Sequence, residues 1–125
     1  FGGISLGYQD SRTGTSGNRV YNNISVNNGG AQYTTFGSAA AGYGGNLCWP
    51  SSSCGPLGTI VADPLLANPN DVKGYHLTSG SPARGKGVTP PVAVPRDIDG
   101  QARPSTGADV GADQYNAVVT DPFRR

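Results

Sequence analysis

Short apolar runs separated by polar turns recur along the first two thirds of the chain. In the run at residues 18–30, Val20, Ile24 and Val26 share one parity, which predicts a strand or two short strands with these side chains facing inward. No stretch repeats with a period of 3.6, so we expect almost no α-helix. The pattern predicts an all-β domain. Its expected extended segments are residues 1–6, 18–30, 31–36, 46–49, 58–66 and 74–77.

Three of the apolar strand centres recur at a roughly constant spacing, and the later steps to Ile60 and Leu77 are shorter. Ile4, Ile24 and Leu47 mark a period in the low twenties, with asparagine and glycine at the corners. Such a period suits a coiled parallel solenoid, in which asparagines at equivalent turns form ladders. An antiparallel sandwich would also give short strands with glycine turns, and the spacing alone does not decide between them. The candidate ladder residues are Asn22, Asn23, Asn27, Asn28 and Asn46.

Glycine, proline and aspartate turns dominate residues 59–115, which we expect to fold back over an exposed end of a sheet. The ordered motifs are Thr59 to Leu66, the Gly-Tyr-His-Leu strand at 74–77, Gly80 to Ala83, Asp97 to Gly100, Arg103-Pro104 and Asp109 to Ala112. This order resembles the C-terminal end of secreted right-handed parallel β-helix proteins of the pectate-lyase-like superfamily. It is most similar to the bacterial choice-of-anchor Q domain group.

The resemblance covers about the last sixty residues and favours the solenoid over the sandwich. Two places depart from the family pattern: Arg84-Gly85 stands where an apolar residue and an aspartate are usual, and Asp113-Gln114-Tyr115 replaces a tyrosine-glutamate pair. The missing carboxylate removes support for an ion or ion pair there.

The expected architecture is therefore a right-handed parallel β-helix of few coils with a loop-rich C-terminal cap. Residues 1–79 would form the coils, and residues 80–125 the cap and tail of the same domain. The residues expected to hold the cap together are Asp63, Pro64, Asp97, Asp99, Arg103 and Asp109.

Size and composition fit one small domain. The 125 residues include 20 glycines and 10 prolines, but a net charge of only +1 argues against a self-repelling disordered chain. Basic residues are scattered and do not alternate with aromatic ones, so we expect no nucleic-acid partner. No long apolar run is present, so we expect no membrane insertion.

Two cysteines, Cys48 and Cys54, enclose a loop of tryptophan, proline and three serines. They could close a small disulfide ring, which would place the protein outside the cytoplasm, or remain free thiols. A zinc site built on them is disfavoured, because His76 is the only histidine and cannot complete a tetrahedral set.

The turn Asp97-Ile-Asp99-Gly100 looks like the start of a calcium loop. Calcium is the only cofactor that the sequence suggests, but a third acidic residue and a terminal glutamate are absent. A structural turn is favoured, in which Asp97 or Asp99 accepts hydrogen bonds from backbone amides or from Arg103. Arg103 would then clamp the cap to the last coil.

Candidate residues for binding and catalysis are sparse. A general base at His76 is conceivable, but neither a nucleophile nor an acid partner is placed by spacing, so a surface or half-buried strand histidine is favoured. If exposed, Tyr33, Tyr43 and Trp49 would offer stacking faces for carbohydrate, although core positions are the more common fate of such residues. By resemblance, an arginine or lysine would be the base of a lyase; the candidates are Lys73, Arg84, Lys86, Arg96 and Arg103.

Two functions remain open. The resemblance implies the terminal segment of a secreted or surface-attached bacterial β-helix that binds or degrades extracellular polysaccharide, with lyase chemistry if it is catalytic. The alternative is a non-catalytic structural or adhesive subunit of an extracellular filament, with neighbouring β-helix subunits as partners. The chain lacks methionine and begins at Phe1, which predicts a processed chain or a piece of a longer one.

Overall fold

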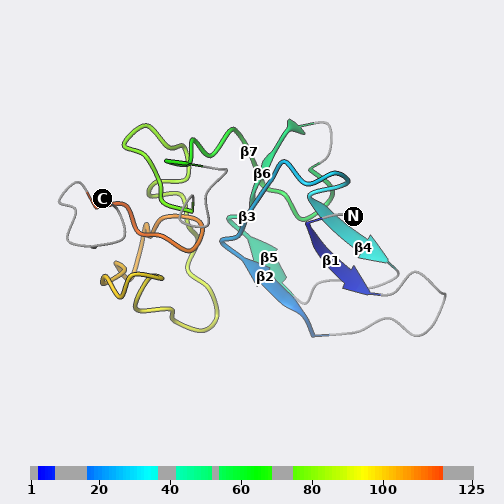
Figure 1. The fold of residues 1–125 in the computed structure, drawn as a ribbon. Helices are drawn as coiled ribbons and strands as arrows, with labels where there is room; N and C mark the ends of the chain where they lie inside the picture. Colours follow the sequence, from blue (N-terminus) through cyan, green and yellow to red (C-terminus); the bar gives the residue numbers. More distant parts are fainter. Residues whose placement is uncertain (1–2, 8–16, 37–41, 52–53, 69–74, 117–125) are drawn as a thin grey trace.

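The computed structural model describes residues 3–7, 17–36, 42–51, 54–68 and 75–116. Over these residues the chain is all β, with short strands and no α-helix, which confirms the predicted class. The strands lie together in one half of the molecule and the later loops in the other (Figure 1). The strands are β1 (Ile4–Gly7), β2 (Arg19–Tyr21), β3 (Ile24–Val26), β4 (Tyr33–Phe36), β5 (Gly42–Gly44), β6 (Leu47–Trp49) and β7 (Ile60–Val61).

All pairings between these strands are parallel. They form the sheets β1-β4, β2-β5 and β3-β6-β7. In the last sheet Leu47 lies opposite both Ile24 and Ile60. Parallel partners need a long connection, so each strand pairs with one that follows after an intervening strand or loop. Successive passes of the chain thus lie side by side between residues 4 and 61, which we call the coil region.

An asparagine corner joins β2 to β3. Asn22 has a φ of 55°, in the left-handed region that asparagine tolerates better than most residues. Asn23 Nδ2 donates to Asn46 Oδ1 over 3.1 Å, across 23 residues of sequence. The amide of the fully buried Asn46 donates in turn to the carbonyls of Val20 and Leu57. The expected asparagine ladder is therefore present for the pair Asn23 and Asn46.

This corner also reverses which side chains face the interior. Val20 is buried before it, but after it the buried side chain is Ser25, which lies opposite Cys48. Ser25 Oγ donates to the carbonyl of Gln32. The prediction that Val20, Ile24 and Val26 share one face is wrong, because strand parity holds only along an uninterrupted strand. Ile24 instead points to the opposite face of its sheet.

A small apolar cluster fills the coil interior. Tyr33 is fully buried at its centre, and its hydroxyl lies 3.0 Å from the carbonyl oxygens of both Asn23 and Leu47. Burial raises the pKa of Tyr33 well above its ordinary value, because the phenolate would lose its hydration. The cluster consists of Val20, Tyr33, Cys48, Cys54 and Leu57, with Ile4 packed against it.

The predicted disulfide between Cys48 and Cys54 is confirmed. It closes the loop beside Tyr33, and Gly55 follows it with a φ of 73°. A Cβ atom at Gly55 would lie 1.8 Å from the carbonyl oxygen of Tyr33, so only glycine fits this close approach. The chain that follows the disulfide is therefore in direct contact with the backbone of Tyr33.

Residues 62–116, which we call the cap region, pack on the outer face of β3-β6-β7. Leu47 is fully buried there, against Leu77, Ala83 and Val110 of the cap region. Ile24 and Ile60 flank Leu47 on the same face. The turns therefore cover a face of the sheet, whereas we expected them to cover its end. Val61, on the opposite face of the edge strand β7, is 51% exposed.

Three expectations about individual segments need correction. The described part of the expected strand at 74–77 forms only an isolated antiparallel bridge between Leu77 and Leu66. Strand β5 lies outside all of the extended segments that we expected. Ile4 pairs with Tyr33, so it is not a register marker for Ile24. In the described residues no helix is long and apolar enough to cross a membrane.

Candidate functional site

A cleft of about 820 Å³ lies between the asparagine corner of the coil region and the cap region. One wall is formed by residues 21–24 and Val26, and the other by parts of residues 87–112. Tyr21 and Tyr75, both half-buried, line it. The segment from Val88 to Pro95 contributes mainly valine, alanine and proline side chains. The cleft is therefore largely apolar, with an aromatic ring from each region.

The two walls are joined by hydrogen bonds at Asn22. Its Oδ1 accepts from the amide of Val88 over 2.9 Å, and its Nδ2 donates to the Val88 carbonyl over 2.7 Å. The carbonyl of Asn22 accepts from the amide of Gly111 over 2.8 Å. A Cβ atom at Gly111, whose φ is 98°, would approach Ile24 Cδ1 to 2.7 Å. These hydrogen bonds therefore link the coil and cap regions directly at this corner of the cleft.

Arg103 is the only formally charged side chain among the described residues that line the cleft. Its Nη1 donates to the carbonyl of Asp109 over 3.0 Å and its Nη2 to the carbonyl of Gly111 over 2.7 Å. Its Nε is buried and has no hydrogen-bond partner among the described residues. These contacts orient the guanidinium through neutral carbonyls. Among the described residues no carboxylate forms an ion pair with Arg103.

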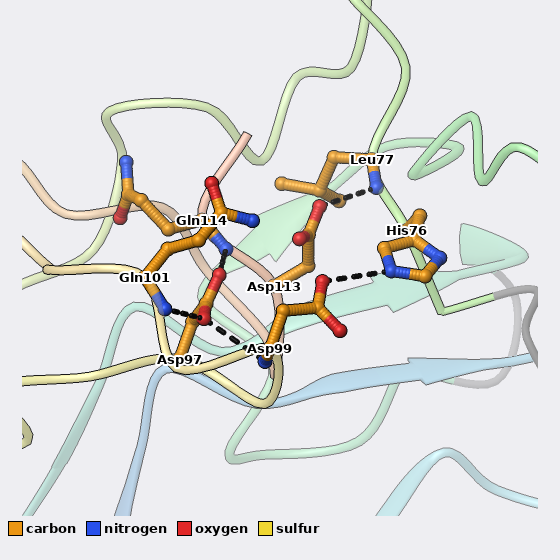
Figure 2. Close-up of polar contacts among 7 residues, drawn as sticks. All are labelled: His76, Leu77, Asp97, Asp99, Gln101, Asp113 and Gln114. Atoms are coloured by element: carbon orange, nitrogen blue, oxygen red, sulfur yellow. Dashed lines mark hydrogen bonds and ion pairs between the residues drawn. The ribbon is translucent and has the colours of Figure 1, made fainter. Parts of the chain in front are cut away.

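A second polar cluster lies within the cap region, where His76, Asp99 and Asp113 converge (Figure 2). One ligand-type atom from each lies within 4.8 Å of the other two. His76 Nε2 is 2.8 Å from Asp99 Oδ2, and Asp113 Oδ2 accepts from the amide of Leu77 over 2.8 Å. The side chains of His76 and Asp99 are 6% and 5% exposed, and Asp113 is fully buried. These residues could hold a metal ion.

Asp97 binds the backbone of the segments that carry Asp99 and Asp113. Its Oδ1 accepts from the amides of Asp99 and Gln101, over 3.0 and 2.7 Å, and its Oδ2 accepts from the amide of Gln114 over 3.0 Å. Figure 2 shows these bonds linking the turn that carries Asp99 to the segment that carries Asp113. The ring of Tyr75 lies 4.5 Å from that of His76, so the cluster adjoins one aromatic wall of the cleft.

The carbohydrate candidates are dispersed. Tyr33 cannot offer a stacking face, because it is fully buried in the interior cluster, and we correct that expectation. Tyr43 is 49% exposed on β5, and Trp49 is half-buried on β6. Neither lines the cleft. Their interaction with carbohydrate stays a prediction.

The two aspartates suggested for calcium, Asp97 and Asp99, have different hydrogen-bond partners. Both oxygens of Asp97 accept backbone amides, as in the structural turn that we favoured. Asp99 faces His76. Arg103 bonds to carbonyls within the cap region and to neither aspartate, so the expected clamp between cap and last coil is wrong.

The other expected cap residues occupy turns. Asp63 Oδ1 accepts from the amide of Leu65, and the carbonyl of the buried Pro64 accepts from Ser81 Oγ over 2.5 Å. Asp109 accepts from the amides of Gly85 and Tyr115, over 2.7 and 2.6 Å. Each of these contacts joins segments of the cap region or closes one of its turns.

Sequence reasoning missed the partners of His76. We expected a surface or half-buried strand histidine without an acid partner, but His76 is 5% exposed and its partner follows 23 residues later. Local spacing could not reveal this pair, because irregular turns bring the two residues together. The one available signal was a single histidine ahead of a run of aspartate turns.

Comparisons with known proteins add no relative. No family model, no curated protein and no solved structure matches this chain.

Proposed function

We propose that this chain is the C-terminal part of a secreted right-handed parallel β-helix protein, and that it binds an extracellular polysaccharide containing uronic acids in the cleft between its two regions. The parallel pairing of β1 to β7 and the ladder of Asn23 and Asn46 support the β-helix. The ordered motifs of residues 59–115 support the relationship to carbohydrate-associated proteins.

The observation that carries the ligand class is Arg103. It lines the cleft with a positive charge that no described carboxylate neutralises. A uronate supplies a carboxylate on an otherwise neutral sugar ring, and a charge-assisted bond to a guanidinium is stronger than one between neutral groups. Tyr21 and Tyr75 offer aromatic surface for the apolar faces of sugar rings.

Binding suits this cleft better than cleavage does. Its lining contains no histidine, lysine, aspartate or glutamate from the described part of the chain. Proton abstraction from a uronate needs a base within hydrogen-bond reach, and the guanidinium of Arg103 is engaged with two carbonyls. The lyase version of the hypothesis therefore has less support than binding.

Calorimetric titration with oligomers of galacturonate and of glucose tests the ligand class. We expect the acidic oligomer to bind more tightly, with an affinity that falls as salt screens the charge. Arg103→Gln should weaken binding of the acidic oligomer, whereas Arg96→Gln should not. Arg96 is a matched control because it is exposed, donates to the carbonyl of Gly100 and lies outside the cleft.

Equal affinity for both oligomers would reject a charge-based site. An equal loss in the two arginine variants would place the acidic oligomer elsewhere on the surface. Circular dichroism of Arg103→Gln must match that of the wild type for this comparison to count.

A structural subunit is the second candidate, because β7 is the edge of the three-stranded sheet. Val61 lies on β7 opposite Cys48, which faces the interior, yet it is 51% exposed. An exposed apolar residue on a parallel edge strand could pair with the next subunit of a filament. Light scattering on the native protein distinguishes the cases: a large regular particle of 12.7 kDa chains would favour the subunit.

A further inference from the structure

We propose that His76, Asp99 and Asp113 form a binding site for one divalent transition-metal ion of the zinc type. This site is separate from the cleft and does not depend on the proposed polysaccharide function.

The distances are close to those that a single ion requires. Zinc lies about 2.0 to 2.2 Å from imidazole nitrogen and carboxylate oxygen, so two of its ligand atoms are separated by roughly 3 to 4 Å. The three ligand-type atoms here lie within 4.8 Å of one another, and His76 Nε2 lies 2.8 Å from Asp99 Oδ2. To bind one ion, His76 and Asp99 would move slightly apart, and any ligand atoms farther apart than this range would move slightly closer together.

Charge and burial favour a cation at this point. Two carboxylates are held together at side-chain positions that are at most 6% exposed to water. Ionised carboxylates that share a buried site repel each other, and each loses hydration energy. A divalent ion bound between the two carboxylates would offset this repulsion.

The ligand types select the metal class. An imidazole nitrogen with two carboxylate oxygens suits zinc and its neighbours in the first transition row. Calcium takes six to eight oxygen ligands, so this mixed set of three does not suit it. Three protein ligands leave one tetrahedral position for water or another small ligand.

The surrounding contacts hold the ligands in place. Asp97 accepts the Asp99 amide, and the Leu77 amide, next to His76, binds Asp113. Hydrogen bonds of this kind around a metal site fix the orientation of its ligands. Because the three ligands come from three separate segments of the cap region, a bound ion would crosslink those segments and stabilise the cap region against local opening.

The test uses the full chain without a histidine tag, freed of metal by a chelator and dialysed. Calorimetric titration with zinc should show one ion per chain, and zinc should raise the melting temperature, whereas calcium and magnesium should not. The variants Asp99→Asn, Asp113→Asn and His76→Gln should each lower zinc affinity by about 100-fold or more. Asp63→Asn is the matched control, because Asp63 is exposed and also accepts one backbone amide, that of Leu65.

Loss of a buried aspartate could prevent folding, so a second measurement uses the unaltered chain. Cobalt added to the metal-free protein should give the intense visible absorption of a low-coordinate ion, and zinc should displace it. A spectrum that matches cobalt in buffer, or zinc binding that the three ligand variants retain at wild-type affinity, would overturn the proposal.

Discussion

The coil and cap regions satisfy their backbone polar groups in different ways. In the coil region, parallel strands pair with one another, and side-chain amides such as those of Asn23 and Asn46 serve the corners. In the cap region, beyond β7, the described residues form only isolated bridges. There the carboxylates of Asp97 and Asp109 accept hydrogen bonds from five backbone amides. In a sheet, carbonyls of a neighbouring strand would accept such bonds.

This difference shows why so irregular a segment can be ordered. Buried backbone amides need partners, and a carboxylate can bind several amides without any regular repeat. Removing one hydrogen-bonding side chain from the coil region affects a single corner of the strands. Removing one aspartate from the cap region leaves several backbone amides in different turns without their acceptor. The two regions should therefore respond differently to the same kind of damage.

The largest expected effect is at the junction of the two regions. Leu47→Ala removes a fully buried side chain that touches Leu77, Ala83 and Val110, and should lower the free energy of unfolding by about 3 kcal/mol. Urea titration followed by circular dichroism measures it. Leu65→Ala, at a residue 46% exposed, should change stability by less than about 0.5 kcal/mol. Similar losses in both variants would mean that the junction does not hold the regions together.

Removing the disulfide should weaken the coil region selectively. The double variant Cys48→Ala, Cys54→Ala should lose about 2 kcal/mol, because the unfolded chain regains the freedom of a short loop. Fluorescence of Trp49, the sole tryptophan, reports on β6 next to this bond. Amide exchange in the cap region should stay at its wild-type rate; equal acceleration in both regions would contradict the comparison.

Removing Asp97 should have the opposite pattern. Asp97→Ala leaves the amides of Asp99, Gln101 and Gln114 without their acceptor, at a cost of about 2 kcal/mol, because the half-buried site lets water replace part of the loss. Amide exchange should accelerate in the cap region alone. Asp97→Asn, which keeps one acceptor oxygen, should recover part of the protection.

The smallest expected effect concerns Tyr33. Tyr33→Phe removes the hydroxyl whose single proton the carbonyls of Asn23 and Leu47 share, and should cost about 1 kcal/mol at neutral pH. Burial raises the pKa of this phenol, so above its ordinary value of 10.0 the unfolded chain ionises while the folded chain keeps its proton. Stability is therefore complete below pH 10.0 and declines as pH rises beyond it.

Urea titrations at several pH values measure this decline. The Tyr33→Phe variant should show a flatter dependence on alkaline pH than the wild type. Tyr43→Phe, on an exposed ring, should keep the wild-type decline and serves as the control. A wild-type slope in Tyr33→Phe would assign the alkaline transition to another group.

Local sequence patterns predicted the coil region better than the cap region. The β class, the disulfide and the Asn23–Asn46 ladder follow from strand-forming residues, cysteine spacing and asparagines at turns. The prediction that Val20, Ile24 and Val26 all face inward failed, because Asn22 adopts a left-handed conformation that the alternation of side chains does not reveal. Strand β5 was missed since glycine has low strand propensity, and pairing with β2 outweighs it.

The candidate sites were less predictable. Asp97 could be assigned to a turn from its neighbours, because its amide partners Asp99 and Gln101 lie within four residues. The cluster of His76, Asp99 and Asp113 depends on contacts between residues far apart in the sequence, and the neighbouring bond from the Leu77 amide to Asp113 spans 36 residues. Such contacts carry no periodic signal. The walls of the cleft are likewise joined by a long-range contact, the hydrogen bonds between Asn22 and Val88 across 66 residues.

Native-state amide hydrogen exchange, measured residue by residue as urea increases, tests the difference between the two regions most directly. Our account predicts two opening units. Amides bonded to aspartates, such as those of Gln101 and Gln114, should share one opening free energy. Coil amides such as that of Leu47, which donates to the carbonyl of Asn23, should share a higher one. A single opening free energy common to both sets would contradict the account.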